Sequence, residues 1–267
     1  MSVQWSLVLF TALTGTAGWG FAALAFSEFR GKVARENQFF AAIVLLIVLI
    51  VGGCASVTHL SHVEGILGAL QHPTSGIFVE AVLVGLTALP AVIYLILIKQ
   101  NSSANALRVF AVLAAVFGVV LSFMAGESYM MAARPSWNTI LLPMGYAGTA
   151  LPAGIALYML LIGIKGEGIA AELPVALGIG GIIAAVSAAA YGIVSGDTSH
   201  VLILWLLCVL VGGAAPAVIG FAMKKRQEQI KNLTTIALAC SIIGVIAYRC
   251  FMWMCATDIV NFFGMTI

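Results

Sequence analysis

Eight apolar stretches, each long enough to cross a lipid bilayer, dominate this chain of 267 residues. A helix of about 20 apolar residues, rising about 1.5 Å per residue, crosses the roughly 30 Å of hydrocarbon in a membrane. The sequence therefore predicts an all-α integral membrane protein, a bundle of eight transmembrane helices that forms one domain over residues 1–267. The expected helices are Trp5–Phe26, Phe39–Thr58, Ile77–Ile98, Leu107–Met131, Leu141–Ile164, Leu173–Val194, Val201–Met223 and Leu233–Cys255.

The composition excludes several classes of protein. Hydrophobic residues make up 62% of the chain and charged residues 8%, whereas about a quarter of the residues in soluble domains are charged. The helices leave only short connectors, so we expect no soluble domain, phosphate-binding loop or nucleic-acid-binding surface. The five Cys form no CxxC or CxxCH motif, and we expect this chain to bind no metal or other cofactor of its own.

The basic residues orient the expected helices. Ten of the twelve Lys and Arg residues fall in loops on one side, and all four His fall on the other. Because basic loops stay in the cytoplasm, both termini and the loops after the second, fourth and sixth helices are expected outside it. This predicts a multi-pass protein of the cell membrane. The ten residues are Arg30, Lys32, Arg35, Lys99, Arg108, Lys165, Lys224, Lys225, Arg226 and Lys231.

Three ionisable side chains are expected at one depth, near the extracytoplasmic surface. Glu80 precedes Lys99, and Glu127 follows Arg108, by 19 residues, which is roughly 28 Å along a helix. The same estimate brings His59 to this level. A His and a carboxylate that can accept protons at one depth suit the oxidation of a lipid-soluble hydroquinone.

Arg249 lies slightly deeper, in the outer half of the last helix. An isolated charge in hydrocarbon costs at least a few kcal/mol, so the arginine needs a partner, and Glu80 or Glu127 is expected to supply it. Two interpretations follow: an inert ion pair, or a polar pocket that opens to the outer leaflet and binds the hydroquinone.

Aromatic residues gather towards the same side of the membrane. Trp137, Trp205 and Trp253, with Tyr129 and Tyr248, are expected to form a belt at the membrane surface. In the alternative interpretation, one or two of these rings stack on a quinone.

Three segments carry a resemblance to a known family. His59-Leu60 is followed by Glu80, the stretch from Tyr129 through Arg134-Pro135-Ser136-Trp137 reaches Tyr146, and Tyr248-Arg249 precedes Trp253 in the last helix. In this order and spacing, the chain resembles the membrane anchor subunit of the dimethyl sulfoxide reductase family.

The resemblance implies a three-part oxidoreductase of anaerobic respiration. This anchor would oxidise menaquinol and pass electrons to an iron–sulfur subunit and an exported molybdopterin catalytic subunit, which hold the cofactors, while protons leave to the outer side. His59 and Glu80 match the positions expected to take the protons. Glu127, Arg249, Tyr129 and Tyr248 are expected to complete the quinol-binding site.

Two other functions are compatible with eight apolar helices. A b-type cytochrome anchor would hold haem iron between two His on different helices, for which His59 and His200 are the available pair. A secondary transporter would carry inverted repeats and ionisable residues near the midplane.

Overall fold

The computed structural model describes residues 2–58, 74–166, 168–224 and 227–255. These residues form helices and connecting loops, without a strand, and eight of the helical spans are long and apolar enough to cross a membrane. The expected all-α fold is confirmed. The elements are α1 Trp5–Arg30, α2 Arg35–Val57, α3 Gly76–Lys99, α4 Ala104–Glu127, α5 Leu141–Ile164, α6 Glu172–Ser195, η2 Ile203–Ala214, α7 Ala215–Met223, η3 Gln227–Gln229 and α8 Ile230–Met254.

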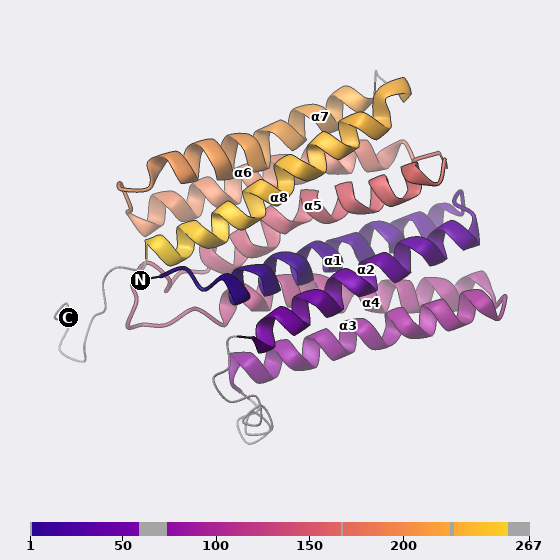
Figure 1. Ribbon diagram of the computed structural model, residues 1–267, viewed down its shortest axis with the longest axis horizontal. Helices are drawn as coiled ribbons and strands as arrows, with labels where there is room; N and C mark the ends of the chain where they lie inside the picture. Colours follow the sequence, from indigo (N-terminus) through magenta and orange to yellow (C-terminus); the bar gives the residue numbers. More distant parts are fainter. Residues whose placement is uncertain (1, 59–73, 167, 225–226, 256–267) are drawn as a thin grey trace.

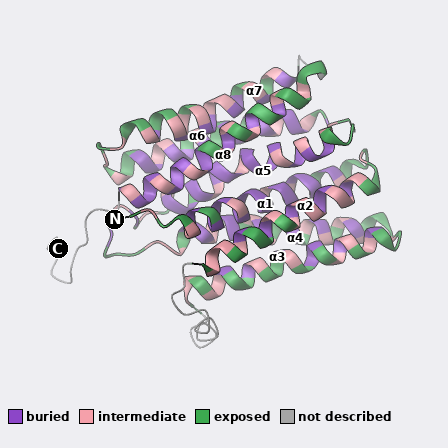
Figure 2. Ribbon diagram, viewed as in Figure 1, coloured by how far each residue is buried: buried purple, intermediate pink, exposed green. Residues whose placement is uncertain are grey.

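The helices lie side by side along the long axis of the molecule (Figure 1), and their contacts divide them into two groups. The first group is α1 to α4, and the second consists of α5, α6, α8 and the continuous η2–α7 span. α1 packs against α4, α2 and α5, and α5 packs against α6, α1 and α8, so these two helices join the groups. Figure 2 shows the buried residues concentrated on this central pair and the exposed residues on the outer helices.

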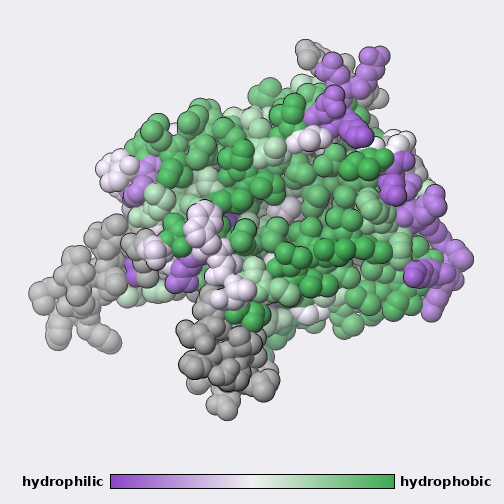
Figure 3. All heavy atoms as spheres, in the orientation of Figure 1, coloured by the Kyte–Doolittle hydropathy of each residue, from purple (hydrophilic) through white to green (hydrophobic). Residues whose placement is uncertain are grey.

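The outer surface of the bundle suits a lipid environment. Large apolar side chains such as Leu89, Ile193 and Leu202 are more than half exposed on it. Figure 3 shows hydrophobic residues covering the middle of one face, with hydrophilic residues gathered at the end that carries the α1–α2 and α3–α4 connections. A soluble protein would bury such side chains, whereas a membrane protein exposes them to acyl chains.

Small residues let the central helices approach closely. A Cβ added at Gly118 in α4 would lie 2.6 Å from the Cα of Gly18 in α1, so the two backbones are in contact. A similar contact joins Gly212 in η2 with Gly244 in α8. Membrane helices associate through such small residues because close backbones gain van der Waals contact.

The seventh span changes its hydrogen-bonding pattern partway along its length. η2 is a π-helix over Ile203–Ala214, and it passes directly into α7, where Pro216 occupies the first turn. Proline has no N–H to donate to the carbonyl of Gly212, so the preceding turn is free to widen. The apolar pattern predicted this span but not its π-helical part.

Candidate functional site

Glu80 lies at the start of the second turn of α3, at the end of the bundle opposite the basic loops. Ser75 caps this helix, and its hydroxyl oxygen accepts a hydrogen bond from the Phe78 amide at 3.3 Å. Gly76 lies against Ser128, because a Cβ added at Gly76 would be 2.8 Å from the Ser128 Cβ. This contact brings the start of α3 against the end of α4. As a result Glu80 is only 8% exposed, and its carboxyl lies near the Ser128 side chain.

An aromatic cluster adjoins this carboxyl. Tyr129, in the loop after α4, lies with its ring centroid 5.9 Å from Trp137, 5.8 Å from Tyr146 and 5.7 Å from Trp253. Burial, and secondarily the neighbouring Glu80 carboxylate, raise the pKa of the Tyr129 hydroxyl well above its ordinary value, so this phenol stays protonated. A buried acid and a neutral phenol therefore lie next to one another at this end of the bundle.

The two tryptophans of the cluster differ in their hydrogen bonds. Trp137 donates its indole N–H to the carbonyl oxygen of Met252 at 2.9 Å, whereas the buried indole N–H of Trp253 finds no acceptor in the part of the chain that the structure describes. Both side chains are buried, 2% and 4% exposed respectively. The expectation that they form a belt at the membrane surface is wrong, because their rings pack edge to face inside the bundle, 5.2 Å apart. Trp205, by contrast, is exposed.

Arg249 is fully buried in α8, and all five of its N–H groups are used within the protein. Nε donates to the Thr11 hydroxyl at 3.0 Å, Nη1 to the Thr149 hydroxyl at 3.2 Å and the Val245 carbonyl at 3.0 Å. Nη2 donates to the carbonyls of Thr11 at 3.1 Å and Tyr146 at 3.3 Å. The acceptors are all uncharged oxygens.

The expected ion pair of Arg249 with Glu80 or Glu127 is therefore wrong for the described residues. Thr11 and Thr149 each donate to a carbonyl of their own helix, at 2.9 Å and 2.7 Å, which leaves their oxygens free to accept from the guanidinium. The arginine is satisfied by neutral oxygens that the sequence pattern did not single out, because four of the five lie on α1 and α5 and meet α8 only in the folded bundle.

Tyr248, like Arg249, makes its contacts inside the bundle. Its hydroxyl donates to the carbonyl of Leu142 at 3.1 Å, and its ring occupies the space left by Gly145. The side chain is fully buried. Its expected contact with a quinol stays a prediction, and the contacts present in the protein are structural.

The remaining expected site residues fall in different surroundings. Glu127 is the last residue of α4 and is exposed. His59 follows the end of α2 by two residues and lies outside the described residues, as do His62 and His72. The meeting of His59 and Glu80 thus stays a prediction, as does the pairing of His59 with His200 around a haem.

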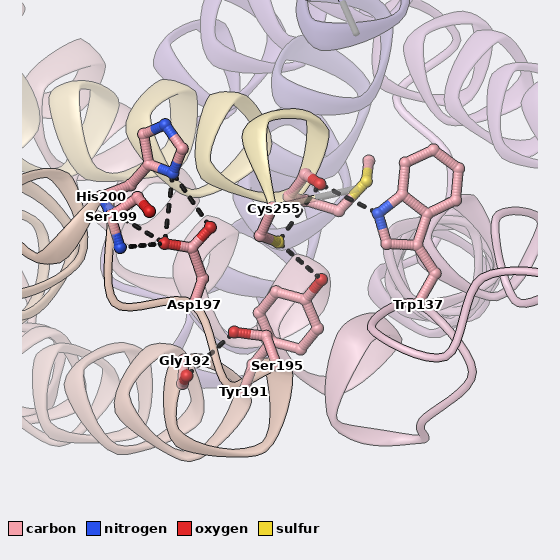
Figure 4. Close-up of polar contacts among 9 residues, drawn as sticks. Trp137, Tyr191, Gly192, Ser195, Asp197, Ser199, His200 and Cys255 are labelled. Atoms are coloured by element: carbon pink, nitrogen blue, oxygen red, sulfur yellow. Dashed lines mark hydrogen bonds and ion pairs between the residues drawn. The ribbon is translucent and has the colours of Figure 1, made fainter. Parts of the chain in front are cut away.

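A separate polar cavity of about 290 Å³ lies at the same end of the bundle, between the loops that precede α5 and η2. Figure 4 shows the His200 imidazole directed at the Asp197 carboxylate, with an Nδ1–Oδ2 distance of 3.0 Å. Oδ1 of Asp197 also accepts from the amides of Ser199 at 2.7 Å and His200 at 2.9 Å. Partial burial acts to raise the pKa of Asp197, but these hydrogen bonds outweigh it and hold the pKa below its ordinary value.

Cys255 forms another wall of this cavity, just beyond α8. Its sulfur lies 3.5 Å from the Tyr191 hydroxyl, the contact drawn in Figure 4. Burial raises the pKa of the thiol to about 11. The thiol is therefore protonated at neutral pH and is a poor nucleophile.

The sequence of the chain matches a known protein family. The sequence model of the DMSO reductase anchor subunit (DmsC) family matches residues 1–194. The chain belongs to this family. It is the membrane anchor subunit of a DMSO reductase-type complex, and it works with catalytic and electron-transfer subunits. No curated protein matches the chain.

The family match covers α1 to α6, and so includes Glu80, Glu127, Tyr129 and Tyr146. Arg249 and Trp253 of this anchor lie beyond the matched residues, although they adjoin Tyr146 and Tyr129 in space. The resemblance to the anchor family is confirmed, while the quinol chemistry of the individual residues stays a prediction. Tyr146 and Ser128 are members of the candidate site that sequence reasoning missed.

Proposed function

We propose that this anchor subunit oxidises menaquinol at the end of the bundle where α3 begins and α4 ends. The observation that carries the proposal is Glu80, a buried carboxyl beside the aromatic cluster of Tyr129, Tyr146 and Trp253. Ionisable residues within membrane spans are costly and mark functional sites. A buried acid next to flat apolar rings provides a proton acceptor together with surfaces that suit a quinone head group.

The proposed reaction separates protons from electrons. Menaquinol loses two protons and two electrons to become menaquinone. Glu80 accepts one proton, and His59, which the family resemblance assigns to the same site, accepts the other. The electrons pass to an iron–sulfur subunit and from there to a molybdopterin catalytic subunit. The chain itself supplies proton acceptors and binding contacts, and the redox cofactors reside in the partner subunits.

The other expected residues take supporting roles in this proposal. Tyr129, whose hydroxyl stays protonated, is placed to donate a hydrogen bond to a quinol oxygen. Glu127, exposed at the end of α4, provides a route for protons to water. The buried Arg249 and Tyr248 fix the position of Tyr146 and the first turn of α5, rather than contacting the quinol themselves.

The orientation of the complex follows from the basic residues. Those of the described chain lie at the end opposite Glu80, except for Arg134 and Arg249. By the positive-inside rule, the Glu80 end faces away from the cytoplasm in the cell membrane. The partner subunits then sit on the extracytoplasmic side. Because protons and electrons leave on the same face, turnover by this subunit does not itself build a membrane potential.

The test is Glu80→Gln in the assembled complex. Glutamine keeps the size and hydrogen-bonding capacity of the side chain but cannot take a proton, so quinol-linked turnover is expected to fall by about 100-fold or more. Turnover with a reduced dye that donates directly to the partner subunits should be unchanged, which controls for assembly. Glu127→Gln, a matched change at an exposed carboxylate, should cause a smaller loss. Undiminished quinol-linked turnover in Glu80→Gln would exclude the proposed role.

A further inference from the structure

An apolar groove of about 600 Å³ lies at the opposite, basic end of the bundle. It runs between α1, α5 and α6, and the end of α7 closes one side of it. Trp19 and Phe26 of α1 and Ile179 of α6 line the groove, and Lys224, which directly follows α7, lines it as well. Phe26 and Ile179 are 39% and 49% exposed, so the groove opens to the outside of the bundle.

The groove exists because small side chains line its floor. Ala22 and Ala23 of α1 and Ala176 of α6 are among the lining residues, and their side chains are too small to fill the space beside the larger ones. At this depth the surroundings of the bundle are acyl chains rather than water. An open apolar slot in such a place is filled by a hydrocarbon chain, since an empty one would lose the van der Waals contacts of its walls.

The rim of the groove carries a net positive charge. Glu172 lines it, but this carboxylate is paired with Arg30 of α1. Lys224 has no carboxylate partner in the described ranges, and the sequence continues from it with Lys225 and Arg226. The Lys224 ammonium is therefore available to bind an anion at the level of the lipid head groups. Basic pockets between membrane helices bind anionic lipid head groups.

We propose that this groove is a binding site for an anionic phospholipid. One acyl chain lies in the slot between Trp19 and Ile179, and the phosphate of the head group contacts Lys224. The site is distinct from the quinol site, since it lies at the other end of the bundle and shares no residue with it. The bound lipid contacts both α1 and the end of α7, and it fills the gap that the protein side chains leave between them.

Lys224→Gln tests the head-group contact. The complex, purified in detergent, is incubated with vesicles of equal phosphatidylglycerol and phosphatidylcholine, and the retained lipids are counted by native mass spectrometry. We expect the wild-type complex to retain phosphatidylglycerol preferentially and Lys224→Gln to retain about fivefold less of it. Lys32→Gln removes the same charge at an exposed position outside the groove, and should retain as much as the wild type.

Two further variants separate the lipid from other occupants. Ala176→Leu fills the slot with Lys224 intact, and should also lower phosphatidylglycerol retention. The indole N–H of Trp19 is buried without an acceptor in the described chain, about 16 Å along the helix from Arg30. A quinone in the groove would bind there. Loss of a bound quinone in Trp19→Phe, together with unchanged retention of phosphatidylglycerol in Lys224→Gln, would overturn the proposal.

Equal retention of the two lipids by the wild type would also overturn it, because the groove would then hold only the surrounding bilayer lipid. So would an equal loss in Lys32→Gln and Lys224→Gln, which would mark a general effect of surface charge. These outcomes do not depend on quinol turnover, so the experiments test the lipid site independently of the quinol site.

Discussion

The guanidinium of Arg249 lies over the ring of Tyr146, with its Cζ 4.6 Å from the ring centroid, and donates a hydrogen bond to the carbonyl of the same residue. A cation held by a ring and five neutral oxygens can remain in the membrane without an anion. Such a desolvated cation–π contact stabilises by about 2 kcal/mol. The arrangement ties α8 to α1 and α5, and it holds Tyr146 against Tyr129 at the candidate site.

Arg249→Lys is expected to destabilise the complex more than Arg249→Met. Lysine keeps the charge but offers three donors in place of five, so at least two charged hydrogen bonds, each worth about 1.5–3 kcal/mol, are lost. Methionine removes the charge together with the need to solvate it, and an apolar replacement of a buried ion is often tolerated. Thermal unfolding of the purified complex measures the difference. A stable Arg249→Lys and an unstable Arg249→Met would show that the charge itself is required, as an anionic partner would demand.

Trp137→Phe is expected to lower the stability of the complex, whereas Trp253→Phe is not. Trp137→Phe loses the hydrogen bond to Met252 and should lower the melting temperature, since the carbonyl is left without this donor. Trp253→Phe removes an N–H that already lacks a protein acceptor, so the melting temperature should not fall.

The same pair tests the proposed quinol site. If the Trp253 N–H serves a quinol oxygen, Trp253→Phe raises the KM for quinol several-fold while the dye-linked activity is unchanged. A melting temperature lowered as far as in Trp137→Phe would contradict the assignment, because it would reveal a structural partner for this N–H.

The sequence predicted the fold well because hydropathy alone determines which segments span a membrane. Counting residues along each helix also predicted that Glu80 and Glu127 lie at the same end of the bundle, and the bounds of α3 and α4 agree with this. The partners of Arg249 escaped prediction for a physical reason. Thr11 and Thr149 lie 238 and 100 residues away in the chain, and hydropathy carries no information on how each helix is rotated about its axis.

The aromatic residues show the same limit. Depth along a helix placed Trp137 and Trp253 near a membrane surface, and that estimate does not distinguish a ring facing lipid from one facing the bundle. In the structure both rings face inward, where they pack against Tyr129. The family resemblance supplied what hydropathy could not, namely which carboxyl is expected to belong to the quinol site.

The close contact of α1 and α4 makes a further prediction about packing. Gly18→Ala should lower the melting temperature of the complex, because its Cβ would overlap the backbone of Gly118 and push the two helices apart. Gly85→Ala is the matched control. A Cβ at Gly85 meets no atom within 4 Å, and alanine favours the helix by about 1 kcal/mol, so this variant should be as stable as the wild type or more so. Equal stability of the two variants would contradict the contact between α1 and α4.

The Asp197–His200 contact predicts a pH dependence in the loop before η2. Hydrogen bonds hold the pKa of the folded Asp197 below its ordinary value of 3.8. The folded state therefore binds this proton less tightly than the unfolded chain, and the stabilisation is present above about pH 4 and lost as the pH falls through the folded pKa. Asp197→Asn should accordingly lower the melting temperature at pH 7, and its difference from the wild type should shrink below pH 4.

Thr198→Ala, in the same loop and lining the same cavity, is the control for this measurement. It removes a polar group without a titrating proton, so its difference from the wild type should stay constant from pH 7 to pH 3. A constant difference for Asp197→Asn as well would mean that the carboxylate is not stabilised by His200 and the amides, since only a depressed pKa makes the contribution of Asp197 vanish in acid.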